Sequence, residues 1–355
     1  MRPSKIQSTV LDLVNANLVP MVLGPPGCGK TASISQAVEE SGHETMWLHP
    51  ISMRPSDIQG IGFVVDGRAE FLPYGFMRKM VEFSPREDGQ KLVVIIDDAF
   101  QANDSVQKVL QQLILHRGVG DLFVSEHVRF VMISNRLSDK AGVRTILSTC
   151  TSRAIPLSFD VNLDDWMKWA AKHDIHPLIQ GFLRNQRDML YKGEPTNTGE
   201  PWASPRGWEF CSRGMMATPP DCHMAIAVGS VGEAVGTNFM GFAKTADKMV
   251  PTADIFKNPK GVPIPDKNDK DFVPVMWATL GSINSVMQQV HEKAPKIISE
   301  TVKRYFDYVE RLPVEFQAVA IRDGIESTPN CITHDSENRY RNWMTKHQNQ
   351  CWETW

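Results

Sequence analysis

The chain has 355 residues, of which 42% are hydrophobic and 22% charged, and its formal net charge is −3. This length supports one large domain or two ordinary ones, and the near-balanced charge does not predict a nucleic-acid or anionic-membrane partner, although a local basic patch stays open. The six cysteines lack the paired spacing of zinc or redox motifs, which is typical of reduced thiols in the cytosol. Neither a secretory signal nor an apolar run long enough to span a membrane is present, so we expect a cytoplasmic protein without a membrane partner.

In chain order, the first predicted elements lead to a loop that favours neither helix nor strand. Residues 1–16 have apolar side chains at helical spacing, and residues 18–23 predict a short buried strand. The sequence "GPPGCGKT" follows at 24–31, and a helical pattern then runs to Gly42. The loop fits the pattern G-x-x-x-x-G-K-[ST] in the strand–loop–helix setting that this pattern requires. A chance glycine turn is the alternative, and the setting disfavours it.

The residue types in this loop suit the binding of a nucleoside triphosphate with Mg²⁺. Glycines let several backbone N–H groups approach phosphate oxygens, and the start of the following helix adds partial positive charge. The lysine can reach the β- and γ-phosphates, and the threonine hydroxyl can bind Mg²⁺. The residues expected to contact ATP are Gly24, Pro25, Pro26, Gly27, Cys28, Gly29, Lys30, Thr31 and Ala32.

Residues 59–76 predict a β-hairpin. Apolar and aromatic residues stand on both sides of a "DGR" turn that contains Gly67. These side chains either pack within the hairpin or contact a peptide or partner segment, and the sequence leaves both open. No alternation of basic and aromatic residues predicts a DNA channel, although the basic residues nearby keep one open.

Two further strands end in polar residues that suit ATP hydrolysis. Residues 91–99, "KLVVIIDDA", predict a central parallel strand buried on both faces. Because ligands bind at the carboxyl ends of such strands, Asp97 is placed to hold Mg²⁺ through water, and Asp98 is placed to polarise an attacking water. Residues 128–136 predict a third strand, and its Asn135 is a candidate to orient that water or to sense the γ-phosphate. The alternatives are acids that cap the next helix and an ordinary turn asparagine.

The motifs "GPPGCGKT", "VVIIDDA" and "MISNR" occur in the order and approximate spacing of the AAA+ ATPases. Residues 54–80 and 109–143 further resemble the MoxR-type members, which include the CbbQ, NorQ and GvpN types. The resemblance implies a three-layer αβα core with a parallel sheet, followed by an α-helical lid and a C-terminal helical extension. It makes Lys30 and Thr31 the Walker A residues, Asp97 and Asp98 the Walker B residues, and Asn135 the sensor 1 residue.

One residue departs from the family pattern. The family usually has Glu at the position of Asp98, and Asp is shorter by one methylene. The resemblance therefore implies an ATP hydrolase whose turnover is slow unless the backbone compensates for the shorter side chain, whereas nucleotide binding is unaffected.

The resemblance also implies arginines that act on the nucleotide. Arg153 matches the arginine that reaches the nucleotide of the neighbouring subunit, and Arg144 is a candidate for a second contact across that interface. Arg206 follows a Ser-Pro helix start and matches the sensor 2 arginine of the lid. Surface ion pairing is the alternative for Arg153 and Arg144. An arginine that acts in trans implies a homo-oligomeric ring, which in this family is a hexamer.

The same patterns divide the chain into three parts. We expect residues 1–160 to form the nucleotide-binding core, with the hairpin segment at 54–80, and residues 161–249 to form the lid. Residues 250–355 are expected to form a proline-rich connector and a helical extension with a helical pair at 275–312. The tail carries Trp343, Trp352 and Trp355, which suit either docking on a partner or packing on the chain's own lid.

The resemblance implies an ATP-driven chaperone that remodels or activates a protein partner, in this family often one with a von Willebrand A domain. Two alternatives use the same core: an ATP-dependent nucleic-acid motor or loader, and a scaffold that nucleotide stabilises with weak hydrolysis. The compact size and the departures from the bacterial pattern favour a phage-encoded member that acts in the host cytoplasm.

Overall fold

The computed structural model describes residues 1–87, 89–139, 153–193, 199–245, 248–327, 334–335 and 337–347. These residues form two compact units, one over Met1–Asn162 and the other from Leu163 onward. The three-part division at residues 160 and 249 stays a prediction. Within the described ranges, no helix has an apolar stretch of the length that a membrane crossing needs.

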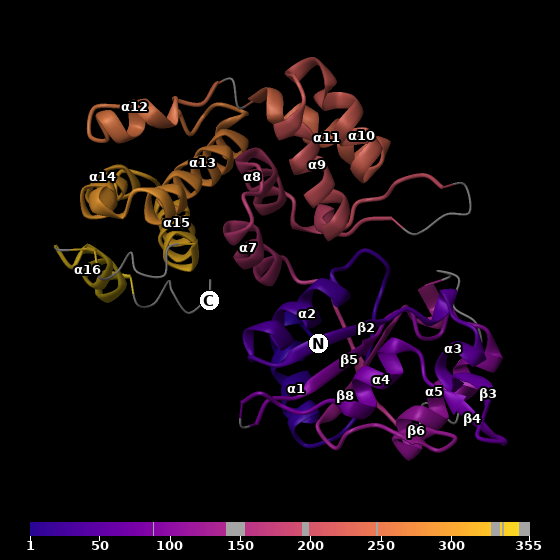
Figure 1. Cartoon of the computed structure of the whole chain (residues 1–355). Helices are drawn as coiled ribbons and strands as arrows, with labels where there is room; N and C mark the ends of the chain where they lie inside the picture. The colour runs from indigo at the N-terminus through magenta and orange to yellow at the C-terminus, as the bar shows by residue number, and fades with distance from the viewer. Residues whose placement is uncertain are drawn as a thin grey trace. The chain divides into compact units, whose positions relative to one another are not determined.

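The first unit is built on a five-stranded parallel sheet (Figure 1), whose strands stand in the order β2-β5-β8-β1-β9. The strands are β1 (Pro20–Leu23), β2 (Glu44–Leu48), β5 (Leu92–Ile96), β8 (Val128–Ser134) and β9 (Ile155–Ser158). The strands predicted within 18–23, 91–99 and 128–136 are thereby confirmed. Because β8 lies between β1 and β5, the three strands that carry the predicted motifs are neighbours with their carboxyl ends at one edge.

Helices cover both faces of this sheet. They are α1 (Pro3–Asn15), α2 (Lys30–Glu40), α3 (Pro55–Gln59), α4 (Gly75–Glu82) and α5 (Asp104–His116). Apolar side chains of α3, α4 and α5 form one core with side chains such as Phe130 and Met132 of β8. The alternate residues Val131 and Ile133 are buried on the other face, where α1 packs against β1 and β8. The predicted three-layer αβα core is therefore confirmed.

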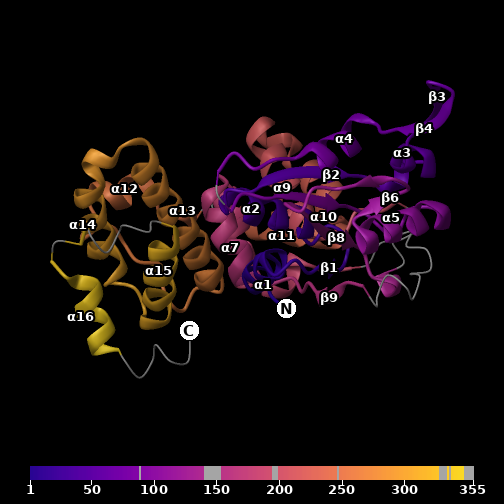
Figure 2. The ribbon, with the colours of Figure 1, turned by 60° about the horizontal axis from the view of Figure 1, so that its bottom comes forward.

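The predicted hairpin is also confirmed. Strands β3 (Ile61–Val65) and β4 (Arg68–Leu72) pair antiparallel, and both turn residues, Asp66 and Gly67, have positive φ angles of 50° and 78°. Figure 2 shows this hairpin extending away from the five-stranded sheet of its unit. A smaller ribbon, β6 (Gly118–Val119) and β7 (Leu122–Phe123), follows α5.

The second unit is helical in its described part. Its helices are α7 (Leu163–Lys172), α8 (Pro177–Asn185), α9 (Pro205–Ala217), α10 (His223–Val231), α11 (Glu233–Thr245), α12 (Thr252–Lys257), α13 (Phe272–Lys293), α14 (Ile298–Val309), α15 (Val314–Ser327) and α16 (Arg339–Lys346). The helical pair predicted at 275–312 is confirmed as α13 and α14. The proline-rich stretch contains α12, which sequence patterns did not indicate and which starts directly after Pro251.

The tail tryptophan Trp343 belongs to the core of its own unit. Its side chain is 6% exposed, and its Nε1 donates a hydrogen bond to Gln317 Oε1 at 2.7 Å. Arg339, at the start of the same helix, pairs with Asp307 and Glu310 of α14 and the residue after it. Trp343 therefore packs on helices of its own chain, but on those after residue 249 and not on the predicted lid. Trp352 and Trp355 lie outside the described residues.

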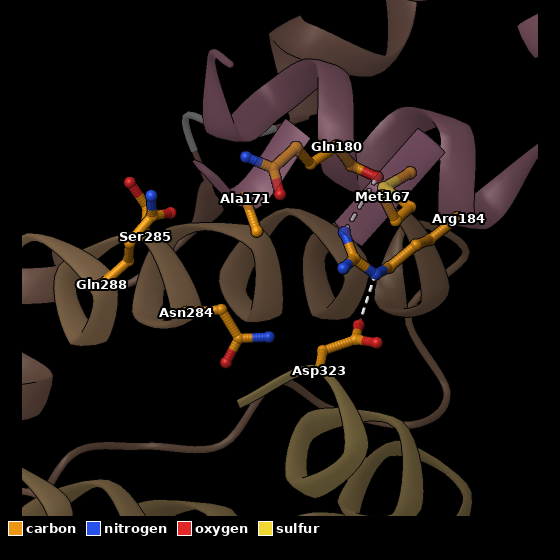
Figure 3. Close-up of a pocket in the computed structure, with 8 residues that line it drawn as sticks. All are labelled: Met167, Ala171, Gln180, Arg184, Asn284, Ser285, Gln288 and Asp323. Carbon is orange, nitrogen blue, oxygen red and sulfur yellow. Dashed lines mark hydrogen bonds and ion pairs between the residues drawn. The ribbon is translucent and has the colours of Figure 1, made fainter. Parts of the chain in front are cut away.

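A buried polar cluster joins four helices of this unit (Figure 3). Arg184 of α8 forms an ion pair with Asp323 of α15, and these side chains are 8% and 5% exposed. Arg184 Nη1 also lies 3.5 Å from the Gln180 carbonyl oxygen, while Met167 of α7 and Asn284 of α13 line the cavity beside it. The cavity measures about 10 Å³, which is room for about one water molecule and excludes a nucleotide.

Removal of one partner of this pair should destabilise the protein strongly. In Asp323→Ala, the Arg184 charge stays buried without its carboxylate, so we expect the free energy of unfolding to fall by about 3–5 kcal/mol in chemical denaturation. The matched control is the exposed pair of Lys192 with Asp188, whose side chains are 50% and 68% exposed. Asp188→Ala should change the unfolding free energy by less than about 1 kcal/mol. Equal losses in both variants would contradict this account of the cluster.

Candidate functional site

The loop predicted to bind phosphate runs from the end of β1 to the start of α2. Its first glycine, Gly24, donates its N–H to the Ser134 carbonyl oxygen at 3.4 Å. A Cβ on Gly24 would lie only 2.8 Å from the Phe159 carbonyl oxygen, so a larger residue would push the loop from the sheet. Gly29 is the N-cap of α2 and has a φ of 95°, which is accessible to glycine at little cost. The loop therefore directs the first N–H groups of α2 toward one point, as an anion site requires.

The Lys30 ammonium group lies at the centre of the site. The side chain is 7% exposed, and Nζ donates to the carbonyl oxygens of Gly24 and Pro25 at 2.8 Å each. It also donates to Asn135 Oδ1 at 3.0 Å and contacts Cys28 Sγ at 3.8 Å. Burial lowers the pKa of Lys30, an effect that Cys28, Asp139 and the two Walker B acids partly offset. Burial likewise raises the pKa of the Cys28 thiol.

The residues predicted to hold Mg²⁺ lie close together: Thr31 is in the first turn of α2, and Asp97 directly follows β5. Thr31 Oγ1 lies 3.3 Å from both carboxylate oxygens of Asp97, although these residues are far apart in sequence. The Asp97 N–H donates to the Leu48 carbonyl oxygen of β2 at 2.9 Å, which anchors the backbone of this acid in the sheet. A hydroxyl and a carboxylate are the hard oxygen donors that Mg²⁺ prefers.

Asp98 follows in a tight turn. Its φ angle is 52°, in the left-handed region, and its N–H donates to Asp97 Oδ1 at 3.1 Å. Its own Oδ1 accepts a hydrogen bond from Gln101 Nε2 at 3.0 Å. Sequence patterns did not single out Gln101, because no motif marks a residue whose importance comes from the turn that brings it back to Asp98.

Arg136 is a second residue that sequence patterns missed, although it directly follows the predicted sensor. Its Nη2 donates to the Phe159 carbonyl oxygen and to Ser158 Oγ, both at 2.8 Å, and pairs with Asp160 at 3.2 Å. This guanidinium group therefore ties the ends of β8 and β9 together behind Gly24. The sequence signal that could have indicated Arg136 was its place at the end of the motif "MISNR".

These donors fit a nucleoside triphosphate with Mg²⁺. Within the described residues, no carboxylate lies at ion-pair distance from Lys30 Nζ, so a buried cation has only neutral acceptors as partners. An ammonium group removed from water is stabilised by an anion, which the γ-phosphate would supply. Thr31 and Asp97 stand beside it with oxygen donors for the metal.

Arg153 lies at the opposite edge of the sheet. It precedes β9, whose first residue Ile155 donates its N–H to the Val19 carbonyl oxygen at 2.8 Å, just before β1 starts. Lys30 stands beyond the other end of β1, and the four residues of that strand alone span about 13 Å. Arg153 lines a cavity of about 340 Å³ together with Arg117 and Arg129 of the same edge. Arg153 therefore does not join the phosphate loop of its own chain.

The described structure leaves the roles of the other two predicted arginines as predictions. Arg206 is exposed near the start of α9 in the second unit, where Ser204 Oγ caps the helix by accepting the Gly207 N–H at 3.1 Å. The helix start predicted there is confirmed, but the role of Arg206 as sensor 2 stays a prediction. Arg144 lies outside the described residues.

The comparisons with known proteins show what this part of the chain is similar to. Residues 20–151 match the family model of the AAA domain, dynein-related subfamily. This part of the chain is therefore similar to an AAA domain. Domains of this family bind ATP, typically with Mg²⁺, and the match includes Lys30, Thr31, Asp97, Asp98 and Asn135.

No curated protein matches the chain in sequence. Among solved structures, the chain is similar to the RuvB Holliday junction branch migration motor of Thermotoga maritima, at 15% identity and a TM-score of 0.35, with 73% of this chain and 75% of that chain covered. It is also similar to a putative ATPase from Cytophaga hutchinsonii, at 9% identity and a TM-score of 0.33, with 89% and 79% covered. Arg153 and Arg206 lie beyond the range that matches the AAA domain.

Proposed function

We propose that this chain is a subunit of a cytoplasmic, ring-forming ATPase of the MoxR type that remodels or activates a protein partner. The observation that carries the proposal is the buried Lys30 ammonium group, which lacks a carboxylate partner in the described structure and contacts Asn135 beside the Thr31–Asp97 pair. A buried cation among neutral acceptors has a physical reason to bind a phosphate. The reaction is hydrolysis of ATP to ADP and phosphate.

Each residue has a distinct task in this proposal. Lys30 and the N–H groups at the start of α2 bind the phosphates, and Thr31 and Asp97 hold the metal ion. When bound, Mg²⁺ supplies positive charge that neutralises the phosphate oxygens. Asp98 accepts a proton from the attacking water, whose oxygen forms a bond to the γ-phosphorus as the bond between that phosphorus and the ADP oxygen breaks. Asn135 orients the water.

The proposed ring follows from where Arg153 stands. A residue at the amino edge of the sheet does not reach the carboxyl edge of its own chain. A head-to-tail assembly joins two different surfaces of neighbouring copies, so the amino edge of one copy can face the carboxyl edge of the next. A guanidinium group then completes the pocket in trans and stabilises charge in the transition state. A hexamer is the closed ring that the MoxR resemblance implies.

The β3–β4 hairpin supports a role in contacting the partner. Opposite residues share a face, so Ile61, Phe63 and Leu72 lie on one face, and Val64 and Phe71 lie on the other. All five are exposed, from 43% for Ile61 to 78% for Val64. Apolar side chains exposed on both faces of an isolated ribbon are typical of an interaction surface. We propose that this surface binds the client, a protein with a von Willebrand A domain.

A capture experiment tests the client. The Asp98→Asn chain, which should bind ATP without turnover, is used with ATP and Mg²⁺ to capture proteins from the source cells. We expect a von Willebrand A protein as the main bound species, lost on the further change Phe63→Ser with Phe71→Ser. The matched control is Phe123→Ser, which changes a side chain 64% exposed on β7 and should leave capture intact. The chaperone proposal would be refuted if nucleic acid were the only bound species, or if capture were unchanged by the Phe63→Ser and Phe71→Ser changes.

A further inference from the structure

We propose that Gln101 is a positioning residue for the general base, and that Asp98 and Gln101 form one catalytic turn. The inference rests on the proposed function, because it concerns the water that attacks ATP. The Gln101 side-chain amide donates a hydrogen bond to one carboxylate oxygen of Asp98. This hydrogen bond thereby fixes the direction of the carboxylate that is to take the proton.

The turn that joins the two residues is closed by two hydrogen bonds. The Gln101 N–H donates to the Asp98 carbonyl oxygen at 3.0 Å, and Gln101 Nε2 donates to Asp98 Oδ1 at 3.0 Å. The residues on either side are anchored, since Ala99, Phe100 and Ala102 are at most 1% exposed. The Ala99 N–H also donates to the Ile133 carbonyl oxygen of β8 at 3.2 Å. Gln101 therefore projects from a backbone that the core and the sheet hold in place.

The backbone of this turn explains why the base is an aspartate. A φ of 52° places Asp98 in the left-handed region, which Asp tolerates better than Glu because its short side chain bonds locally. From this backbone, the Asp98 carboxylate reaches Gln101 Nε2. The amide of Gln101 supplies the orientation that the shorter side chain needs.

The Gln101 amide is a matched hydrogen-bond donor for the Asp98 carboxylate. The two side chains lie 3.0 Å apart, from Gln101 Nε2 to Asp98 Oδ1. A glutamate at position 101 would have the same size, no donor and a negative charge. Gln101→Glu should therefore convert a supporting contact into repulsion, which alanine at the same position would not do.

The first test measures ATP hydrolysis by the full chain under assembly conditions. We expect Gln101→Ala to lower kcat about tenfold, with KM for ATP and the affinity for a non-hydrolysable analogue within about twofold, since positioning acts on the chemical step. Gln101→Glu should lower kcat further, since it replaces the donor with a like charge. The matched control is Gln112→Ala on the exposed face of α5, which should leave kcat unchanged.

The second test uses the nucleotide-free protein. At neutral pH, Gln101→Glu places two carboxylates together and should lower Tm. The loss should shrink in an Asp98→Asn background, because Asn removes the second charge and tolerates the left-handed backbone. A purely structural role for Gln101 would give a loss independent of residue 98.

The outcomes separate this inference from the proposed function. If Asp98→Asn abolishes hydrolysis but Gln101→Ala and Gln101→Glu keep kcat within twofold, Gln101 is not a positioning residue. If the assembled chain neither binds nor hydrolyses ATP, or Asp98→Asn hydrolyses it normally, the proposed function and this inference fail together. Loss of kcat with a Tm loss in Gln101→Glu that is the same in the Asp98→Asn background also contradicts the direct contact.

Discussion

Lys30→Met should abolish ATP binding without harming the fold. The change removes a buried ammonium group and keeps an unbranched side chain of similar length, so the loss of contacts to the phosphates should weaken ATP binding by at least about 100-fold, or about 3 kcal/mol. In the nucleotide-free protein, Tm should stay the same or rise, because the variant no longer buries a charge among neutral acceptors. A nucleotide-binding titration and thermal unfolding without nucleotide measure the two effects.

The control for this prediction is Lys108→Met, which changes an exposed lysine on α5 and should alter neither quantity. Unmodified protein with ATP at about 100 times its Kd should gain about 2.7 kcal/mol of stability, and that gain should disappear only in Lys30→Met. ATP affinity that survives Lys30→Met would place the nucleotide elsewhere and remove the basis of the proposed function.

Arg153→Ala should lower kcat about 10³-fold or more while ATP still binds. An arginine that stabilises transition-state charge in phosphoryl transfer typically supplies that much, and Arg153 stands at the edge of the sheet away from its own phosphate loop. Arg153→Lys should recover little, since an ammonium group lacks the planar fork of a guanidinium group. Hydrolysis assays and analogue binding distinguish the loss of catalysis from the loss of affinity.

A mixing experiment decides whether this arginine acts in trans. Lys30→Met and Arg153→Ala chains are each expected to be inactive, but in mixed rings some interfaces combine an intact Lys30 with a neighbour's intact Arg153. For equal amounts and random assembly, about a quarter of the interfaces should regain activity. The control is a chain with both changes, which should rescue neither partner. Mixtures that stay inactive although they co-assemble would show that the arginine does not act across the interface.

Much of the candidate site could be predicted because its signals are local. A glycine-rich loop between an apolar strand and a helix specifies its own backbone, and the acids after "LVVII" are placed by the end of a buried strand. The hairpin was predictable for the same reason, since Asp66 and Gly67 provide the turn that its register requires. The short helix α12 was not predicted, because the proline-rich composition of its segment indicated a connector. The helix begins directly after Pro251.

The amino-acid sequence by itself determined the chemical groups of the candidate nucleotide site and their order: a lysine and a threonine after the first strand, two acids after β5, and an asparagine after β8. Only the tertiary structure decided that Asn135 contacts Lys30, because that contact depends on β8 lying between β1 and β5 in the sheet. It likewise decided the left-handed backbone of Asp98, its partner Gln101, and the place of Arg153 at the far edge. Strand order and turn geometry arise from packing between segments distant in the chain, and no local pattern encodes them.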